Sequence, residues 1–195
     1  KELSVIVARN ISGEMKCFPV VEMEFNEDSN LVEYVMCPAN ISNDIEKRAM
    51  QIAMNTSEKF NMVGLLAVEL FLTKEDEILI NEVAPRPHNS GHYTQDGTNV
   101  CQFEQHLRAI CGWPLREPKL RSPTVMLNLL GEHIPALQAW HVGLPAEAHL
   151  HWYGKAEARP GRKMAHINLC AASLGEALEE LDKWNLRSPP KRIYT

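Results

Sequence analysis

The sequence predicts an α+β fold with a mostly antiparallel sheet. Short β-branched runs follow one another with turn residues between them, and segments with apolar residues at helical spacing interrupt these runs. Of the 195 residues, 45% are hydrophobic and 23% are charged, so the chain can bury a sizeable core. The same composition excludes a disordered, collagen-like or low-complexity protein.

Three strands are expected first. Leu3–Arg9 is a β-branched run, and the turn residues Asn10–Gly13 lead from it into Met15–Met23, which predicts a hairpin. Leu31–Cys37 is a third run of this kind, and Pro38 ends it because proline cannot donate to a sheet.

A helix and a second hairpin follow. Asn43 and Glu46 have the spacing of a capping box, and apolar residues then recur at helical spacing up to Phe60. Val63–Leu72 is a long apolar strand, and Ile78–Glu82 is a shorter strand that returns beside it.

The second half begins with a long loop. Val83–Asn99 is rich in Pro, Gly, Asn and His and has no periodicity, which is typical of an ordered functional loop. A helix over Val100–Cys111 follows and ends at Gly112. The remaining segments are a polar link at 115–123, strands at 125–130, 149–153 and 163–169, a helix at 174–186 and a tail from 188.

The net charge of −5 hides an uneven distribution. Residues 1–114 carry 9 Lys and Arg against 17 Asp and Glu, whereas residues 115–195 carry 11 against 8. The acidic balance of the whole chain argues against a general nucleic-acid binder. We therefore expect two domains, 1–114 and 115–195, with a cation site in the first and an anion site in the second.

Other features of the sequence indicate the cellular compartment of the protein. The five cysteines form no CxxC pair, which favours a reducing cytoplasm over a disulfide framework. No window has 18 uncharged apolar residues and no basic-apolar leader opens the sequence, so we expect neither a membrane span nor a signal peptide. The chain begins at Lys1, without methionine and within a strand pattern, which indicates a piece of a longer protein.

Glu69 and Glu82 are candidate metal ligands. Both lie in apolar strands, where an ionised carboxylate is costly without a cation or donors. If a four-residue loop, Lys74–Glu77, joins the strands, Glu69 lies directly opposite Glu82, and a divalent cation would offset their repulsion. Oxygen ligands favour magnesium, with manganese as an alternative. A three-residue loop would place them on opposite faces, and two solvent-facing edge glutamates are the other alternative.

The densest polar cluster is the run 81–92. Two prolines flank Arg86 and stiffen the backbone, which favours anion binding by its guanidinium group. His88 and Asn89 add further polar side chains to the cluster. His88 and His92 also have the i,i+4 spacing of a zinc pair, although the prolines and the glycine argue against a helix there.

A second basic cluster lies between two predicted strands. Residues 155–163 contain four cations around a Pro-Gly turn, which would suit a phosphate group. The alternative is a solvated charged turn.

Five runs of the sequence resemble one known family. They are Ala-Val-Glu-Leu-Phe (67–71), Asn-Glu-Val-Ala-Pro-Arg-Pro-His-Asn-Ser-Gly-His (81–92), Gln-Phe-Glu-Gln-His-Leu-Arg-Ala-Ile (102–110), Asn-Leu-Leu-Gly (128–131) and Tyr-Gly-Lys with Arg-Pro-Gly-Arg-Lys (153–163). In this order they resemble the 5-(carboxyamino)imidazole ribonucleotide synthetases, ATP-grasp enzymes that form the ATPase subunit of phosphoribosylaminoimidazole carboxylase.

The resemblance implies a fold and a reaction. Residues 1–114 would be the carboxy-terminal lobe of an ATP-grasp domain, and 115–195 a small β-rich carboxy-terminal domain with a phosphate-binding basic loop. The family uses ATP to convert bicarbonate to carboxyphosphate, which carboxylates the exocyclic amine of 5-aminoimidazole ribonucleotide in purine synthesis. The family's amino-terminal domain and most of its lid would precede Lys1, so this piece alone should not turn over.

The resemblance also implies residue roles at the nucleotide end of the site. Glu69 and Glu82 would hold the magnesium ions that bridge the ATP phosphates, with Asn81 assisting. Glu2 and Glu22 match positions that line the nucleotide pocket.

At the other end, the matched residues are mostly cationic or polar. Arg86, His88 and Asn89 match catalytic positions around bicarbonate and the aminoimidazole. Lys155 and Arg162 match the pair that grips the 5′-phosphate of the ribonucleotide.

Two alternatives remain open at this stage. Another ATP-grasp carboxylating enzyme would share the paired glutamates but should lack the run 86–92, and a non-catalytic module would keep only a phosphate pocket. The family resemblance further implies a homodimer, and no nucleic-acid or membrane partner is expected.

Overall fold

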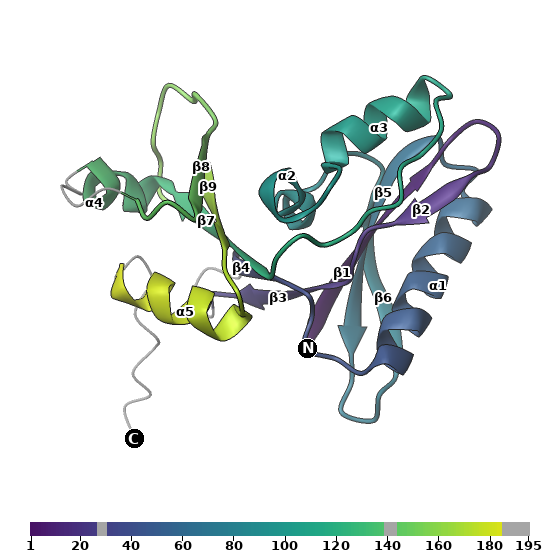
Figure 1. Ribbon diagram of the computed structural model, residues 1–195, viewed down its shortest axis with the longest axis horizontal. Coiled ribbons are helices and arrows are strands. Elements are labelled where there is room, and N and C mark those ends of the chain that lie inside the picture. The colour runs from purple at the N-terminus through teal and green to yellow at the C-terminus, as the bar shows by residue number, and fades with distance from the viewer. Residues whose placement is uncertain (27–30, 139–143, 185–195) are drawn as a thin grey trace.

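The computed structural model describes residues 1–26, 31–138 and 144–184, and it confirms the α+β class (Figure 1). The strands are β1 (Glu2–Arg9), β2 (Met15–Cys17), β3 (Val21–Phe25), β4 (Val32–Cys37), β5 (Gly64–Leu72), β6 (Ile78–Ala84), β7 (Thr124–Leu130), β8 (Ala148–Trp152) and β9 (Lys163–Cys170). The helices are α1 (Asn43–Lys59), α2 (Thr94–Gly97), α3 (Gln102–Ile110), α4 (Ile134–Gln138) and α5 (Leu174–Lys183), with short 3₁₀ turns η1 (Asn89–Gly91) and η2 (Gly131–His133).

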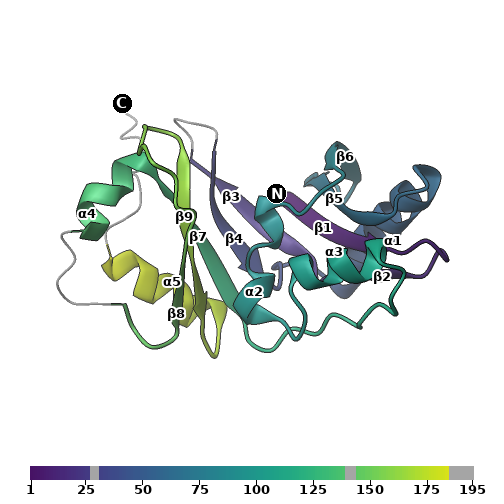
Figure 2. The same ribbon diagram turned by 90° about the horizontal axis from the view of Figure 1, so that it is seen from above.

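All the described strands belong to one sheet. Their order is β6-β5-β1-β3-β4-β7-β9-β8, with β2 paired to β1 outside this path, and every pairing is antiparallel. Strands β3 and β4 lie between the two ends of the molecule (Figure 2). Because β4 pairs with β7, the sheet continues without a break from the amino-terminal half into the carboxy-terminal half.

Different helices cover the two faces of the amino-terminal half of the sheet. Successive residues of a strand point to opposite faces. Leu3 and Val7 of β1 pack in the cluster that contains Ala49 of α1. Ile6 of β1 lies in another cluster, which contains Ala109 of α3. The sheet therefore lies between α1 and α3 (Figure 1).

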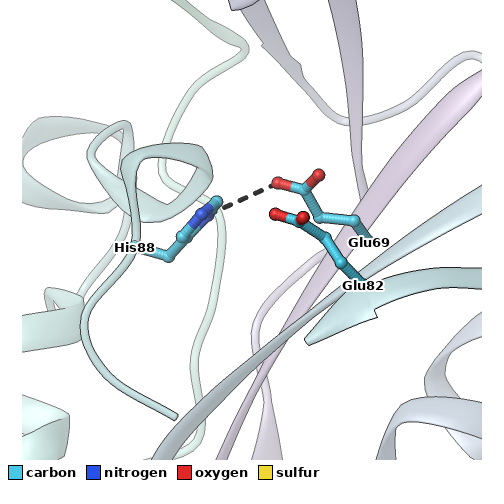
Figure 3. Close-up of side chains that lie close together, drawn as sticks. All are labelled: Glu69, Glu82 and His88. Carbon is cyan, nitrogen blue, oxygen red and sulfur yellow. Dashed lines mark ion pairs between the residues drawn. The ribbon is translucent and has the colours of Figure 1, made fainter. Parts of the chain in front are cut away.

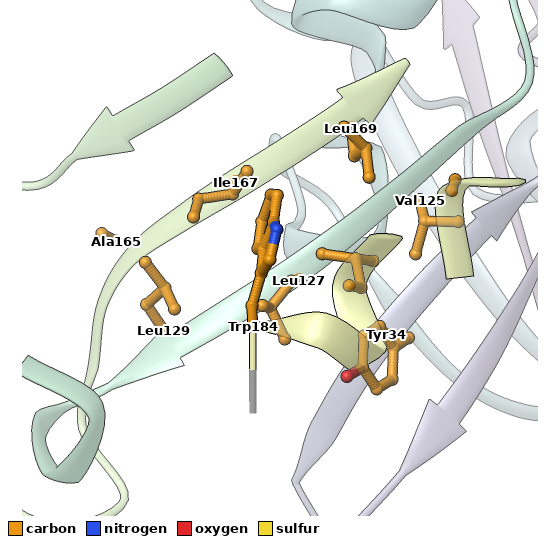
Figure 4. Close-up of a cluster of buried hydrophobic side chains, with 10 residues drawn as sticks. Tyr34, Val125, Leu127, Leu129, Ala165, Ile167, Leu169 and Trp184 are labelled. Carbon is orange, nitrogen blue, oxygen red and sulfur yellow. The ribbon is translucent and has the colours of Figure 1, made fainter. Parts of the chain in front are cut away.

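The carboxy-terminal half has a core of its own. Side chains of β7 and β9 pack on Leu181 and Trp184 at the end of α5, and Tyr34 of β4 joins them (Figure 4). Tyr34 is 1% exposed, so a residue of the amino-terminal half belongs to the carboxy-terminal core.

Most predicted elements are present, with local differences. Ser42, not Asn43, caps α1: its hydroxyl accepts the backbone N–H of Ile45 at 3.3 Å. The predicted strand 15–23 is two strands, β2 and β3, and both pair with β1. The predicted loop 83–99 contains η1 and α2, and α4 was not predicted at all. The expected tail from residue 188 lies outside the described residues.

Strand β6 lies at the edge of the described sheet. Its side chains Leu79, Ile80 and Val83 are exposed, at 52%, 51% and 36% of their surface. All five cysteines are free. Among the residues placed by the structure, no helix has the length and apolar character needed to cross a bilayer.

Candidate active site

Glu69 and Glu82 face each other across paired strands. Glu69 of β5 lies directly opposite Glu82 of β6, so the predicted juxtaposition is confirmed. The turn that leads to it differs from the expected one. Leu72 pairs with Ile78, which makes the loop one residue longer than predicted, and a β-bulge at Asn81 then shifts the register by one.

The surroundings of Glu69 disfavour its ionised form. Glu69 is 8% exposed. The pKa of its carboxyl group is raised to about 7, first by burial and then by the carboxylates of Glu82 and Glu2, whereas the ammonium group of Lys163 acts in the opposite direction. Ionised Glu69 is therefore stabilised by additional positive charge at this place.

His88 lies beside the two carboxylates. Glu69, Glu82 and His88 each offer one ligand atom, and these atoms lie within 4.8 Å of one another (Figure 3). Nδ1 of His88 is 3.7 Å from Oε1 of Glu69. Burial, and then the charges of Arg86 and Lys163, lower the pKa of His88 to about 4, so the ring is neutral at pH 7. Two carboxylates beside a neutral imidazole fit a divalent cation, and carboxylate oxygens suit magnesium or manganese.

The fold holds the His88 ring by several bonds. Its Nδ1 accepts the backbone N–H of Ser90 at 3.3 Å and lies 2.9 Å from the Ser90 hydroxyl, which is 2.8 Å from the hydroxyl of Ser4 in β1. The side-chain amide of Gln102 makes two hydrogen bonds to the backbone of His88. Its oxygen accepts the N–H of His88 at 2.9 Å, and its nitrogen donates to the carbonyl of His88 at 2.8 Å. Nδ1 is thus an acceptor, and the proton lies on Nε2.

The zinc pair of His88 and His92 does not form. Nδ1 of His92 lies 2.9 Å from Nε2 of Gln102, and His92 is absent from the metal-ligand group found among the described residues. His88 has an extended backbone and caps η1, and His92 follows that 3₁₀ turn, so the two residues do not lie one turn apart on a single α-helix.

Asn89 and Lys163 join the two halves of the molecule. The amides of Asn89 and Asn128 of β7 bond to each other reciprocally, at 2.8 and 3.1 Å. The ammonium group of Lys163 donates to Oδ1 of Asn89 at 2.8 Å. Burial lowers the pKa of Lys163, Glu69 raises it, and Lys155 and Arg86 lower it further, so the ammonium group lies within the electrostatic reach of both acidic and basic residues.

Sequence reasoning gave Lys163 no role of its own, although it placed the residue in the basic run. A signal was available: Lys163 opens a strand whose following residues, Met164 to Leu169, are mostly apolar. Asn128 was quoted only as part of a motif. Its contact with Asn89 depends on which strands pair, and the sequence pattern does not define that.

The basic loop, residues 153–162 between β8 and β9, is held against β7 and η2. Lys155 donates to the backbone carbonyl of Lys163, and its ammonium group lies 5.3 Å from the centre of the Tyr153 ring. The Arg162 guanidinium donates to the backbone carbonyl of Glu157 at 3.2 Å and is exposed. A Cβ atom at Gly131 would lie 2.1 Å from the carbonyl oxygen of Arg159, so only glycine allows this approach.

The remaining predicted residues are not all in one place. Glu2 is on the same sheet face as Glu69, and its charge acts on that carboxyl group. Glu22 pairs with Leu3, which puts it on the opposite face, where it accepts from Lys1 at 2.8 Å and lines a hollow of about 400 Å³. The structure therefore does not bring Glu22 to the carboxylate cluster. Asn81 is exposed at the bulge beside Glu82.

Arg86 lies near the cluster of Glu69, Glu82 and His88. It is exposed, and its guanidinium donates to the carbonyl of Pro87 at 3.2 Å. Its charge lowers the pKa of both His88 and Lys163, so it lies near the predicted catalytic histidine.

Comparison with known proteins identifies the family. The family model described as the ATP-grasp domain matches residues 1–103, more than half of the chain. This chain belongs to the ATP-grasp family. A second model, for the phosphoribosylaminoimidazole carboxylase C-terminal domain, matches residues 124–180. The resemblance inferred from the sequence motifs is confirmed.

Individual relatives of this ATP-grasp chain agree with that assignment. The N5-carboxyaminoimidazole ribonucleotide synthase of Bacillus subtilis is 44% identical over 184 residues, which are 94% of this chain and 48% of that protein. The chloroplastic phosphoribosylaminoimidazole carboxylase of Vigna aconitifolia is 43% identical over 183 residues, which are 89% of this chain and 32% of that protein.

Solved structures show the same fold. An N5-carboxyaminoimidazole ribonucleotide synthetase in complex with ADP has a TM-score of 0.91 and 45% identity, over 95% of this chain and 48% of the other. The Aspergillus clavatus synthase, in complex with ADP and 5-aminoimidazole ribonucleotide, has a TM-score of 0.86 and 35% identity, over 94% of this chain and 50% of the other. The chain spans about half the length of these relatives.

Proposed function

We propose that this chain is the part of an N5-carboxyaminoimidazole ribonucleotide synthetase that supplies the metal carboxylates and the ribonucleotide phosphate site. The reaction would use ATP and bicarbonate to make carboxyphosphate and then carboxylate the exocyclic amine of 5-aminoimidazole ribonucleotide. One observation supports this most directly. Lys163 interacts electrostatically both with Glu69 of the carboxylate cluster and with Lys155 of the basic loop, so the two sites adjoin.

At the nucleotide end, Glu69 and Glu82 are proposed as ligands of magnesium, with manganese as an alternative, and Asn81 and Glu2 as nucleotide-side groups. A bound divalent cation would neutralise charge on the ATP phosphates. Each carboxylate contributes a negative charge that offsets the charge of the cation, and their opposed placement fixes where it binds. Glu22 is retained as a nucleotide residue from the resemblance alone, since it lies on the other sheet face.

At the substrate end, the chain offers cations and a neutral imidazole. Arg86 is proposed to bind the bicarbonate-derived carboxylate, and the Nε2–H of His88 to donate a hydrogen bond to it. Asn89, held by Asn128 and Lys163, orients the aminoimidazole. Lys155 and Arg162 bind the 5′-phosphate with charge-assisted hydrogen bonds.

The remaining features of the proposal come from the sequence. The resemblance implies bicarbonate as co-substrate and a homodimeric full-length enzyme, and the cysteine pattern favours a cytoplasmic location. The charge distribution and the resemblance together indicate a division of the chain at residue 114 into an ATP-grasp lobe and a carboxy-terminal domain. The two matched family models, 1–103 and 124–180, leave the link 115–123 between them, which supports that division.

Calorimetric titration of the 195-residue chain tests the substrate assignment. We expect 5-aminoimidazole ribonucleotide to bind at least tenfold more tightly than inorganic phosphate. Arg162→Ala should weaken ribonucleotide binding by about ten- to a hundredfold, the value of one or two charge-assisted bonds, and leave ADP binding unchanged.

Arg121→Ala is the matched control, because Arg121 is exposed in the same half of the chain and lies outside the basic loop. Equal affinity for ribonucleotide and phosphate would contradict the substrate assignment. Equal weakening of ribonucleotide and ADP by Arg162→Ala would contradict the phosphate role of this residue.

A further inference from the structure

A column of four aromatic rings crosses from α3 to the strands that carry the basic loop. Phe103 of α3 stacks on His92 with ring centres 5.9 Å apart. His92 stacks on His166 of β9 at 4.7 Å, and His166 stacks on His151 of β8 at 4.6 Å, with interplanar angles of 13° and 15°. His151 and His166 lie directly opposite each other in β8 and β9, the two strands that the basic loop connects.

The far end of the column is anchored to α2. Oδ2 of Asp96 lies 2.7 Å from Nε2 of His151 and accepts from the side-chain amide of Asn168 at 2.7 Å. Nε2 of Gln95 lies 3.1 Å from Nδ1 of His151. Both ring nitrogens of His151 therefore have a hydrogen-bond partner in α2.

The two inner rings of the column, His92 and His166, are neutral at pH 7. Burial, followed by the charges of neighbouring groups, lowers the pKa of His92 to about 4 and that of His166 to about 2. Neutral rings can stack face to face, whereas protonated rings at these distances would repel one another. At neutral pH the rings of His92 and His166 therefore stack without charge repulsion.

His166 occupies the column at an energetic cost. It is 1% exposed, and its Nε2 is buried without a hydrogen-bond partner among the described residues. A phenyl ring would stack in the same place without a buried unsatisfied nitrogen. What the imidazole adds is its Nδ1, which lies 2.8 Å from the hydroxyl oxygen of Tyr153.

Tyr153 connects this bond to the basic loop. It follows β8 directly, its backbone N–H donates to the carbonyl of Met164 at 3.1 Å, and the ammonium group of Lys155 lies over its ring. A ring fixed at its hydroxyl presents a fixed face to that cation, which favours one position of the ammonium group.

We propose that His166 is a positioning residue, which acts through Tyr153 to hold Lys155 where the ribonucleotide phosphate binds. This inference rests on the proposed function. Pre-positioning would lower the entropy that the lysine loses when the phosphate binds, so it should affect the ribonucleotide and not the nucleotide.

The test compares the two partners of the bond. His166→Phe keeps the stacked ring and removes Nδ1, and Tyr153→Phe keeps the ring under Lys155 and removes the hydroxyl. Calorimetry on the 195-residue chain should show 5-aminoimidazole ribonucleotide binding weakened about three- to tenfold by each substitution. The double variant should bind no more weakly than either single one, because both remove the same bond. ADP binding should change by less than about twofold.

Leu150→Phe is the control, a residue of the same hairpin whose side chain is 40% exposed and lies outside the column. It should bind the ribonucleotide like the unsubstituted chain. A purely structural role of His166 would lower the thermal midpoint and weaken both ligands together, and this result would overturn the proposal. Tyr153→Phe removes one half-buried hydroxyl, so it supplies the answer if His166→Phe does not fold.

The outcomes separate the two proposals. If the unsubstituted chain binds the ribonucleotide no better than inorganic phosphate, the proposed function is wrong and the positioning role is wrong with it. If the unsubstituted chain discriminates but His166→Phe and Tyr153→Phe bind like it, or if their effects add, only the positioning role is overturned.

Discussion

At the scale of single residues, Glu69 and Glu82 lie opposite each other on paired strands but differ in their exposure to solvent. Glu69 is almost fully buried, whereas Glu82 is exposed. A carboxylate that is exposed in the absence of a cation contributes little to folding, so its removal separates function from stability.

Glu82→Gln should therefore abolish magnesium-dependent ATPase activity in an enzyme restored to the length of its relatives. The stability of the chain should change by less than about 0.5 kcal/mol, because an exposed charge is replaced by an isosteric amide. Activity by phosphate release and stability by thermal unfolding are the measurements. Glu77→Gln, an exposed glutamate of the turn in the same hairpin, is the control. A fully active Glu82→Gln enzyme would exclude the metal role.

The raised pKa of Glu69 predicts a pH dependence. With a folded pKa of about 7 against an ordinary value of 4.5, the folded chain holds a proton that the unfolded chain has released. The ion-free chain should thus lose stability as the pH rises from about 4.5 through 7. A divalent cation must displace this proton, so its affinity should be lower at pH 6 than at pH 8.

Calorimetric titration with manganese at pH 6 and pH 8 measures this difference. We expect several-fold weaker binding at pH 6, with a proton released on binding. His88 has a pKa of about 4 and does not titrate in this range, so the change is assigned to Glu69. Equal affinities at the two pH values would contradict a protonated Glu69.

At the scale of elements, the approach of the basic loop to η2 depends on Gly131. A methyl group there would meet the Arg159 carbonyl at 2.1 Å, and backbone atoms cannot move aside as a flexible side chain does. Gly131→Ala should displace the loop, weaken ribonucleotide binding and cost about 1–3 kcal/mol of stability.

Gly175→Ala in α5 is the contrasting substitution. Its new methyl group would meet only an ordinary contact at 3.8 Å, and alanine is the better helix former. Unfolding in urea should show a loss of stability for Gly131→Ala and a small gain for Gly175→Ala. Unchanged ribonucleotide binding in Gly131→Ala would show that the approach to η2 does not place the loop.

The hairpin of β5 and β6 shows what sequence patterns can and cannot predict. The strands β5 and β6 and the opposed glutamates were predicted because apolar runs and like charges are local signals. The turn between them was predicted one residue too short, and the bulge at Asn81 restored the register. A bulge has no reliable signature in a single sequence, so this agreement depended on two compensating differences.

The rest of the site depends on contacts between distant segments. Lys163 reaches Asn89, 74 residues earlier, only because β7 pairs with both β4 and β9. Glu22 was grouped with Glu69 because both resemble nucleotide-site positions, but strand alternation puts them on opposite faces. Pairing order decides both outcomes, and periodicity within one strand does not encode it.

At the scale of the whole molecule, the continuous sheet predicts cooperative unfolding. β4 pairs with β7 and contributes Tyr34 to the carboxy-terminal core, so neither half can unfold without breaking the other's contacts. Far-UV circular dichroism and tryptophan fluorescence, with Trp184 buried in the carboxy-terminal core, should give coincident transitions. Two separate transitions would show that the halves fold independently, as a strict division into two domains implies.

The position of Glu82 in the exposed edge strand β6 also affects how the chain associates with other copies of itself. Unpaired backbone groups and exposed Leu79, Ile80 and Val83 are the features that allow a sheet edge to recruit another chain. Glu82 is the one charged side chain within β6, and repulsion between two such edges opposes their pairing. A cation that neutralises this carboxylate also removes that repulsion. The proposed metal ligand thereby also opposes self-association of the chain, and this protection would be strongest when no cation is bound.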